Sequence, residues 1–429
     1  MSVKEALSKI LVVVGTTGAG KTKLSIDLAK ALNGEIVNSD AMQMYRGLDV
    51  ATAKVTQEEM DGVPHHLLSC IDPVEECTVI QYKALAMRTI QDIIARGKVP
   101  VIVGGTMYYT QSLLWNGQLL EDVPGSNGDA SPVPLPSSPE EVYRKLQEVD
   151  PVMANGLHSK DVRRVQRSLE VFYQTGKRHS DWIAEQKAEE KLFDACAFWV
   201  DCDRPVLNAR LDKRVDKMVV DGLVPEIEGL MTEIRDHVAA SPVPMGLKGI
   251  TQAIGFKEFE VYLTAKAQGV DDDALHSVLA NCIDELKVGT RQYAKRQVTW
   301  IKNRFVPRNV PVYRFDTSVV DAWPSVVAAP AIEIATSFLR GLPIMTQATC
   351  QETDGVSEKK GPKTKYMCTE CGGREFVGQV QWNEHLRSKG HRFHLKRLRL
   401  LASGQLFERA SKKPKPVADE KATTNNELE

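Results

Sequence analysis

The sequence predicts an α/β fold: a P-loop parallel-sheet core, interrupted by a helical insertion domain and followed by a small C-terminal zinc finger. Short apolar runs alternate with longer helical patterns, which is the order typical of a parallel sheet. A glycine-rich octapeptide follows the first run, and two cysteines and two histidines at metal-ligand spacing lie near the C-terminus. Strands are expected at residues 10–14, 35–38, 99–103, 197–201 and 311–315.

The first strand leads into a phosphate-binding loop. Its sequence GTTGAGKT fits the pattern G-x-x-x-x-G-K-[ST], and a helix is expected to begin near Lys21. Glycines let backbone N–H groups surround a phosphate, and the helix N-terminus adds positive potential. Lys21 adds a charge, and the hydroxyl of Thr22 is suited to Mg²⁺. We expect a phosphorylated ligand on Gly15, Thr16, Thr17, Gly18, Ala19, Gly20, Lys21 and Thr22.

Two further strands end in polar residues. The strand at 35–38 runs into Asp40, and the strand at 99–103 runs through two glycines into Thr106. Ligands of open α/β sheets bind at the carboxyl ends of the strands, so both side chains are expected beside the P-loop. The alternative for Asp40 is a turn or helix cap, whereas capping by Thr106 is compatible with ligand contact.

Six separated segments resemble the signature of the tRNA dimethylallyltransferases, also called tRNA isopentenyltransferases. The resemblance covers roughly residues 8–316 and, with the C-terminal module, points to the eukaryotic type. It implies transfer of a dimethylallyl group from dimethylallyl diphosphate to the exocyclic amine of the adenosine immediately 3′ of the tRNA anticodon. The segments are IVNSDAMQMYRGLDVATAK (36–54), VPHH (63–66), VGGTMYY (103–109), DVRRVQRSLEVFYQTGK (161–177), QAIGFKEF (252–259) and RQYAKRQVTWIKNRF (291–305).

The resemblance assigns the catalytic role of general base to Asp40, which suits chemistry on a weakly nucleophilic amine. Thr106 is expected to contact the pyrophosphate and the amine, and Arg291 to bind the leaving pyrophosphate. Ala41 stands where the family usually has Ser, which removes a hydrogen-bonding group. Met44 is expected to pack in the core. His65 and His66 are expected to shape the substrate loop rather than to catalyse.

Further residues are expected to contact tRNA. Because the reacting base must leave the base stack, side chains of the protein must hold the neighbouring nucleotides in place. For Lys295 and Arg296 the diphosphate, the RNA backbone and plain solvation all stay open. The set consists of Asp40, Ala41, Met42, Gln43, Thr106, Arg163, Arg164, Val165, Gln166, Arg167, Lys295 and Arg296.

The remaining segments define the domains. A Pro/Gly/Ser-rich stretch at 124–139 indicates a loop or linker, residues 140–177 and 180–192 are expected to be wholly helical, and residues 204–236 and 247–303 to supply further helices. A Pro/Ala-rich passage near 323–331 and the polar stretch 346–364 are expected to separate the core from the C-terminal module. The expected domains are the core at 8–123 and 196–345, the tRNA-gripping insertion at 124–195, the linker at 346–364, the finger at 365–405 and a disordered tail at 406–429.

The C-terminal module has the spacing Cys368-x2-Cys371-x13-His385-x5-His391, which is typical of a C₂H₂ zinc site of the RNA-binding type. Phe376, Trp382 and Leu386 are expected to form its core. Residues 359–415 hold 15 Lys and Arg against 4 Asp and Glu, whereas residues 1–358 hold 39 against 48. A basic module on an acidic body suggests binding of a polyanion, and the alternative is a solvated tail.

Composition narrows the class of protein. The 429 residues are 42% hydrophobic and 26% charged, and no apolar stretch approaches the 18 or so residues of a membrane span. The eight cysteines show no disulfide framework, so we expect a cytoplasmic protein, with mitochondrial or nuclear pools open. The basic residues Lys412, Lys413 and Lys415 are weak evidence for a nuclear signal. Rival functions are a P-loop kinase of small molecules, a prenyltransferase of free adenine nucleotides and a non-enzymatic RNA-binding scaffold.

Overall fold

The computed structural model describes residues 7–116, 136, 138–185, 191–240, 249–306, 310–349 and 364–403. The chain divides into two compact units, Met1–Asn127 with Gln186–Val356 and Gly128–Glu185 with Ser357–Glu429. Most of the expected linker 124–139, residues 350–363 of the second linker and the tail 406–429 lie outside the described residues.

The first unit is built on a parallel six-stranded sheet in the order β3-β2-β4-β1-β5-β6. The α/β fold with a parallel sheet and all five expected strands are confirmed. The sequence analysis missed β3, because two polar histidines carry no strand pattern. The strands are β1 (Lys9–Gly15), β2 (Gly34–Asn38), β3 (His65–His66), β4 (Val99–Val103), β5 (Asp194–Asp201) and β6 (Val312–Asp316).

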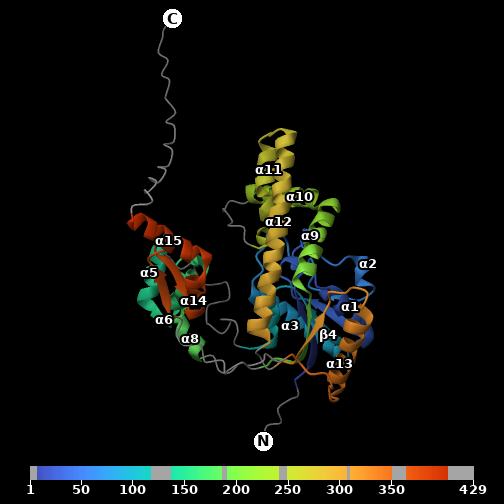
Figure 1. Cartoon of the computed structure of the whole chain (residues 1–429). Coiled ribbons are helices and arrows are strands. Elements are labelled where there is room, and N and C mark those ends of the chain that lie inside the picture. The colour runs from blue at the N-terminus through green and yellow to red at the C-terminus, as the bar shows by residue number, and fades with distance from the viewer. Residues whose placement is uncertain are drawn as a thin grey trace. The chain divides into compact units, whose positions relative to one another are not determined.

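Helices cover both faces of this sheet (Figure 1). Successive side chains of a strand point to opposite faces, so Leu11 and Val13 of β1 join one core and Val12 joins the other. The first core is closed by α1 (Lys21–Leu32) and α13 (Ala329–Arg340), and the second by α3 (Val79–Ala95) and α4 (Met107–Leu114). Burial on both faces explains why β1 reads as a continuous apolar run.

The passage 323–331 is not a separator, and that expectation was wrong. It forms a π-helical turn, η6 (Pro324–Ala328), that continues into α13. The side chains of Trp323, Val327 and Ala331 are buried in the first core, and the indole N–H of Trp323 donates to a carboxylate oxygen of Asp27 at 2.7 Å. Proline in the first turn of a helix needs no N–H partner, so the composition that suggested a linker is compatible with a helix start.

The remaining helices of the first unit stand beyond the carboxyl edge of the sheet around a third apolar core. Residues 204–236 and, within the described part of the chain, 249–303 supply several helices as expected, and the first region is divided at Asp221 and Gly222. Short elements in this unit are η1 (Met42–Met44), α2 (Gln57–Met60), η3 (Ile250–Gln252), η4 (Lys257–Phe259) and η5 (Ile301–Phe305). The longer helices are α9 (Arg204–Val220), α10 (Leu223–Ala240), α11 (Glu260–Ala267) and α12 (Asp272–Trp300).

The second unit joins two segments that are far apart in sequence. Its segment 140–177, expected to be wholly helical, is divided into separate helices, because Asp150 ends one helix and caps the next by accepting from the Met153 N–H at 3.0 Å. Figure 1 shows α14 and α15 beside α5 and α6. The elements are α5 (Pro139–Val149), α6 (Pro151–Gly156), α7 (Val162–Thr175), α8 (His179–Glu185), β7 (Lys365–Cys368), β8 (Arg374–Val377), α14 (Gln379–Arg387) and α15 (Lys389–Ala402).

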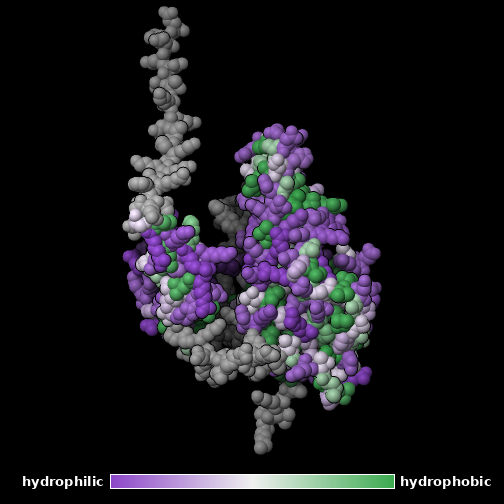
Figure 2. All heavy atoms as spheres, viewed as in Figure 1, coloured by the Kyte–Doolittle hydropathy of each residue, from purple (hydrophilic) through white to green (hydrophobic). Residues whose placement is uncertain are grey.

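Hydrophilic residues cover most of the described surface of this second unit in the view of Figure 2. Across the described part of the chain, none of the helices combines the length and the apolar character that crossing a membrane requires.

Candidate active site at the carboxyl ends of β1, β2 and β4

A cavity of about 760 Å³ opens at the carboxyl edge of the sheet, within the first unit. The loops after β1, β2 and β4 form its base, because parallel strands bring their carboxyl ends to one edge. Helices α9 and α12 supply further charged and polar side chains. Among the lining residues are Lys21, Thr22, Asp40, Met42, Gln43, Thr106, Arg214, Tyr293, Arg296 and Gln297.

The P-loop has the backbone geometry that its glycines predict. Gly18 and Gly20 have φ angles of 78° and 95°, which residues with a Cβ rarely adopt, and Gly20 leads directly into α1. The Lys21 ammonium donates to the carbonyl oxygen of Thr16 at 3.0 Å. The helix N-terminus and Lys21 therefore meet at the base of the cavity.

A second cation, Arg214 of α9, reaches the same loop and donates to the hydroxyl of Thr17 at 2.7 Å. Burial lowers the pKa of Lys21 to about 8; neighbouring Asp40 opposes this and the positive charge of Arg214 adds to it. Burial also lowers the pKa of Arg214. Within the described chain, its buried Nε has no hydrogen-bond partner. Two buried cations and an unsatisfied donor form an anion site.

Asp40 lies in the same cavity, and its Oδ1 accepts from the Met42 N–H at 3.1 Å. Burial raises the pKa of the Asp40 carboxyl, although the charge of Lys21 and backbone N–H groups oppose the shift. A carboxylate with a raised pKa is a stronger base than an ordinary aspartate. Gly105 provides the space, because a Cβ there would stand 2.5 Å from Oδ2 of Asp40.

Thr106 connects the loop after β4 to the loop after β2. Its Oγ1 accepts a hydrogen bond from the Ala41 N–H at 3.0 Å, so the backbone after Asp40 is held although residue 41 has no side-chain hydroxyl. Thr106 follows β4 after two glycines and precedes α4 directly. The Thr106 hydroxyl also lies within hydrogen-bonding reach of the Tyr293 hydroxyl.

Gln297 of α12 connects the P-loop to the loop after β4. Its Oε1 accepts from the Thr17 N–H at 2.8 Å and its Nε2 donates to the Gly105 carbonyl at 2.9 Å, while the side chain is only 3% exposed. The Tyr293 hydroxyl donates to the same carbonyl at 3.0 Å. The side-chain amide of Gln297 therefore fixes the distance between the P-loop and the loop that lies beside Asp40.

We expect Gln297→Ala to lower kcat by roughly 10- to 100-fold, because the buried Thr17 N–H loses its hydrogen-bond partner, at a cost of about 1–3 kcal/mol, and the Gly105 carbonyl keeps only the Tyr293 hydroxyl. The Michaelis constant for the phosphorylated substrate should change less than kcat, since Lys21 and Arg214 remain. The control is Gln292→Ala, an exposed position on the same helix. Equal kcat values for the two variants would contradict the bridging role.

Some of the residues predicted for the site line the cavity, and others lie outside it. Met42 and Gln43 line it, and the Gln43 amide donates to the Thr52 carbonyl at 3.0 Å, while Met44 is fully buried as expected. Arg291 and Lys295 are absent from the residues that line the cavity within the described chain. Arg291 instead forms an ion pair with Asp212.

Of the basic residues on α12, Arg296 is the one that lines the cavity, and its guanidinium lies 5.9 Å from the centre of the Tyr293 ring. Lys295 is exposed. The diphosphate, the RNA backbone and solvation had been open for both residues. Arg296 is placed to contact a ligand in the cavity, whereas Lys295 is placed to contact solvent or a partner outside the cavity.

The predicted tRNA-binding residues of α7 lie in the second unit. Arg163 and Arg164 are exposed, and Arg164 forms an ion pair with Asp161. Val165 is 1% exposed and packs in the core of the insertion, so its side chain has a structural role. Gln166 and Arg167 are partly exposed on the same helix.

The two histidines of the VPHH segment have different surroundings. His66 on β3 contacts the buried carboxylate of Glu35 at 2.7 Å, which indicates a structural role. His65 lines the cavity; its Nδ1–H donates to the Val63 carbonyl at 2.8 Å, and within the described chain its buried Nε2 has no partner. Burial lowers the pKa of His65, so this ring is neutral and offers an acceptor.

Arg214 and Gln297 were missed because α9 carries several other cations and Gln297 resembles a surface residue. The signal available for Gln297 was its position in the RQYAKRQ segment, two helical turns after Thr290 on the buried face. Arg214 had no comparable signal. Its position opposite the P-loop follows from the packing of α9 over the sheet edge.

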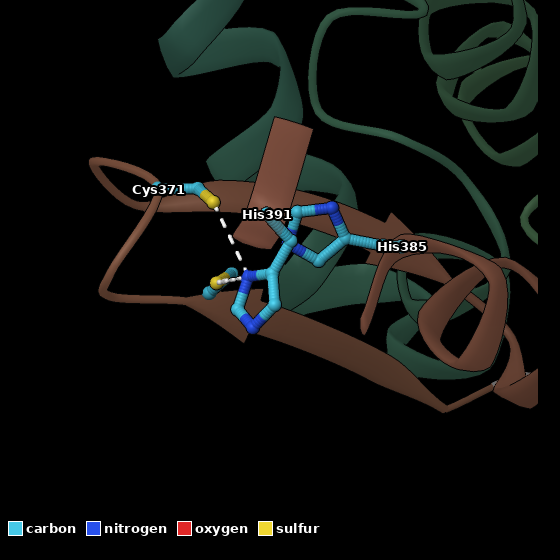
Figure 3. A group of neighbouring side chains, drawn as sticks. Cys371, His385 and His391 are labelled. Atoms are coloured by element: carbon cyan, nitrogen blue, oxygen red, sulfur yellow. Dashed lines mark hydrogen bonds between the residues drawn. The ribbon is translucent and has the colours of Figure 1, made fainter. Parts of the chain in front are cut away.

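The predicted metal ligands come together in the second unit. The donor atoms of Cys368, Cys371, His385 and His391 lie within 4.8 Å of one another, and Figure 3 shows the His391 ring contacting both cysteine sulfurs, at 3.5 and 3.4 Å. In the described chain the buried Nε2 of His385 has no partner. Two sulfurs and two imidazoles at these separations suit a tetrahedral metal ion.

The core of this module differs from the expectation. Phe376 is buried and stacks on the His385 ring, with centroids 4.1 Å apart, and Trp382 stacks on Tyr366. Leu386 is 39% exposed, so its place in the core was wrong. The ring of His385, one of the four candidate metal ligands, packs against Phe376 instead. A module this small has few apolar residues, so a metal ligand can serve as part of its core.

The chain is similar to known proteins over nearly all its length. The family model "IPP transferase" matches residues 43–304. The tRNA dimethylallyltransferases of Mus musculus and Saccharomyces cerevisiae are each 36% identical, over 96% and 91% of this chain and 91% and 92% of theirs. A solved structure of a eukaryotic dimethylallyltransferase acting on tRNA is 33% identical and covers 93% of this chain and 99% of that one, with a TM-score of 0.74.

Proposed function

This chain belongs to the IPP transferase family and is a tRNA-modifying transferase; we propose that it transfers a dimethylallyl group from dimethylallyl diphosphate to the exocyclic amine of the adenosine immediately 3′ of the tRNA anticodon. The observation that carries the proposal is one cavity that holds a two-cation anion site and a carboxylate with a raised pKa. The two sites match the two substrates of this reaction.

In the reaction, the amine nitrogen attacks the first carbon of the dimethylallyl group, and the bond from this carbon to the diphosphate oxygen breaks. Asp40 accepts the amine proton, which restores electron density to a poor nucleophile as the bond forms. Pyrophosphate departs with the bonding electrons. Lys21, Arg214 and the P-loop amides meet the charge that develops on it. Thr106 is placed between the two sites and is suited to orient the amine.

Magnesium fits this cavity through Thr22, which follows Lys21 and lines the wall. A hydroxyl together with diphosphate oxygens is a common donor set for Mg²⁺. The ion would supply additional positive charge for the leaving pyrophosphate. We propose that Arg214, which lines the cavity and contacts the P-loop, performs the task that the family resemblance assigned to Arg291.

We propose that the anticodon arm is held by the arginines of α7 and by the basic helix α15, which carries Arg392, Lys396, Arg397 and Arg399. Phosphate contacts of this kind supply affinity without reading sequence. The Cys₂His₂ cluster is proposed to hold one structural Zn²⁺, which ties two short strands and two helices into a finger.

The test is incubation of the pure protein with labelled dimethylallyl diphosphate and Mg²⁺, supplied with tRNA, AMP or ATP in separate reactions. We expect the label only in tRNA, at the adenosine beside the anticodon. Label in AMP would favour a prenyltransferase of free nucleotides, phosphate transfer from ATP would favour a kinase, and tRNA binding without label would favour a scaffold.

Replacement of Arg163 and Arg164 by Gln should weaken tRNA affinity and reduce the slope of log K against log salt by roughly 0.9 for each phosphate that the variant no longer neutralises. Binding of dimethylallyl diphosphate should not change, because the diphosphate site lies in the first unit. Arg144→Gln is the matched control, since it is another exposed arginine of the second unit, on α5. An unchanged salt slope would contradict the proposed role of these arginines.

A further inference from the structure

The hairpin β7–β8 carries two charged side chains that are almost hidden from solvent. Lys365 and Glu375 are 18% and 14% exposed and form an ion pair at 2.9 Å. Charged side chains are seldom buried unless another surface covers them. In this unit the covering surface is the helical insertion, more than 200 residues away along the chain.

Both partners of the ion pair also contact the insertion. The Ser159 N–H donates to Oε1 of Glu375 at 3.1 Å. The Lys365 ammonium donates to the Tyr143 hydroxyl and lies 4.3 Å from the centre of its ring. Burial would raise the pKa of Glu375, but the bonds from Lys365 and Ser159 outweigh it and lower the pKa. The carboxylate is therefore ionised, and its Oε1 has two partners.

The contacted residues control the start of the arginine helix. Ser159 lies in the loop between α6 and α7, three residues before α7 begins. The Tyr143 hydroxyl donates to the Ala154 carbonyl at 3.0 Å, so α5 and α6 meet at the same point. Glu375 thus holds the segment that leads directly to Arg163 and Arg164.

The hairpin in turn depends on the metal site. Lys365 and Cys368 are the two ends of the four-residue strand β7. A two-stranded hairpin of this size is marginal by itself in water, and a metal ion that ties it supplies the folding free energy. The metal ligands, the hairpin, the ion pair and the start of α7 form one continuous chain of contacts.

We propose that the Lys365–Glu375 pair is a brace that positions the arginine helix of the insertion, so that metal binding in the finger sets the tRNA grip of a different segment of the chain. The finger and the insertion then form one tRNA-binding unit. The linker at 346–364 had instead suggested a finger that is separate from the rest of the chain. The brace rests on the proposed function only where α7 is said to contact tRNA.

The first test is hydrogen exchange of the full-length, zinc-loaded chain without tRNA. Glu375→Gln should bind one zinc per chain, yet exchange of peptides covering residues 158–168 should rise about tenfold, because the Ser159 N–H loses its charged acceptor. Peptides of β5 in the first unit should not change. Glu384→Gln, an exposed position on α14, is the matched control.

A charge swap separates the brace from simple finger stability. The double variant Lys365→Glu with Glu375→Lys keeps an ion pair within the hairpin, but lysine at 375 cannot accept from the Ser159 N–H. Zinc content should stay at one per chain, and exchange over 158–168 should still rise. Removal of zinc from the wild-type chain by a chelator should raise the exchange rate over 158–168 to the same value. In the swap variant, chelation should raise the exchange rate over 158–168 little further.

The functional arm measures the Michaelis constant for tRNA, which we expect to rise about tenfold in Glu375→Gln and in the swap, with kcat at saturating tRNA nearly unchanged. Unchanged exchange over 158–168 in both zinc-loaded variants would overturn the brace. Faster exchange with wild-type tRNA affinity would support the brace and instead contradict the proposed contact between α7 and tRNA.

Discussion

Asp40→Asn should lower kcat by about 10²- to 10⁴-fold, which is the usual contribution of a positioned general base. The amide keeps the size of the side chain and one oxygen for the Met42 N–H, so the cavity should retain its shape. Dissociation constants for tRNA and dimethylallyl diphosphate should stay near those of the wild type. Single-turnover measurements with both substrates saturating isolate the chemical step.

Asp61→Asn is the control, because this aspartate is 63% exposed and lies outside the cavity. A loss of less than about fivefold in Asp40→Asn would show that another group takes the proton, and the neutral His65 would be the next candidate. Restored turnover in Asp40→Glu would support a carboxylate base, although the longer side chain meets Gly105 closely.

The pH profile checks the same assignment. The raised pKa of Asp40 predicts that kcat increases with pH through a value above that of an ordinary aspartate, because only the carboxylate accepts a proton. At high pH, kcat/KM for dimethylallyl diphosphate should fall near pH 8 as free Lys21 loses its charge. Bound diphosphate raises the pKa of Lys21, so kcat should fall only at higher pH.

Arg214→Gln should lower kcat/KM for dimethylallyl diphosphate by about 10²- to 10³-fold, comparable with the loss of one donor that meets developing charge. The variant removes the donor to Thr17 and one of the two buried cations at the P-loop. Affinity for tRNA should change little, and the pKa of Lys21 should rise because a repelling charge is gone.

Arg291→Gln is the informative comparison. The sequence analysis expected this residue to bind the pyrophosphate, whereas the structure pairs it with Asp212 away from the residues lining the cavity. We therefore expect a loss of less than about fivefold, in the range of a partly exposed ion pair outside the cavity. A larger loss in Arg291→Gln than in Arg214→Gln would contradict the proposed division of roles.

Much of the fold was predictable from sequence because its signals are local. The apolar run of β1 and the GTTGAGKT loop define a strand, a turn and a helix start within about fifteen residues. The order of strands and helices then indicates a parallel sheet, whose carboxyl edge gathers Lys21, Asp40 and Thr106. Errors occurred where composition was ambiguous, as at Pro324, where proline began a helix instead of a linker.

The sequence by itself predicted the residues that follow the strands, because strand ends and glycine turns have fixed local geometry, and the family resemblance of six segments supplied the reaction class. Only the tertiary structure decided which of many similar polar side chains reach the site. Arg214 and Arg291 look alike in sequence, but helix packing directs one to the P-loop and the other to Asp212. Likewise Ser159 and Glu375 meet only in the folded chain. Contacts between distant segments depend on how whole elements pack, which no local pattern encodes.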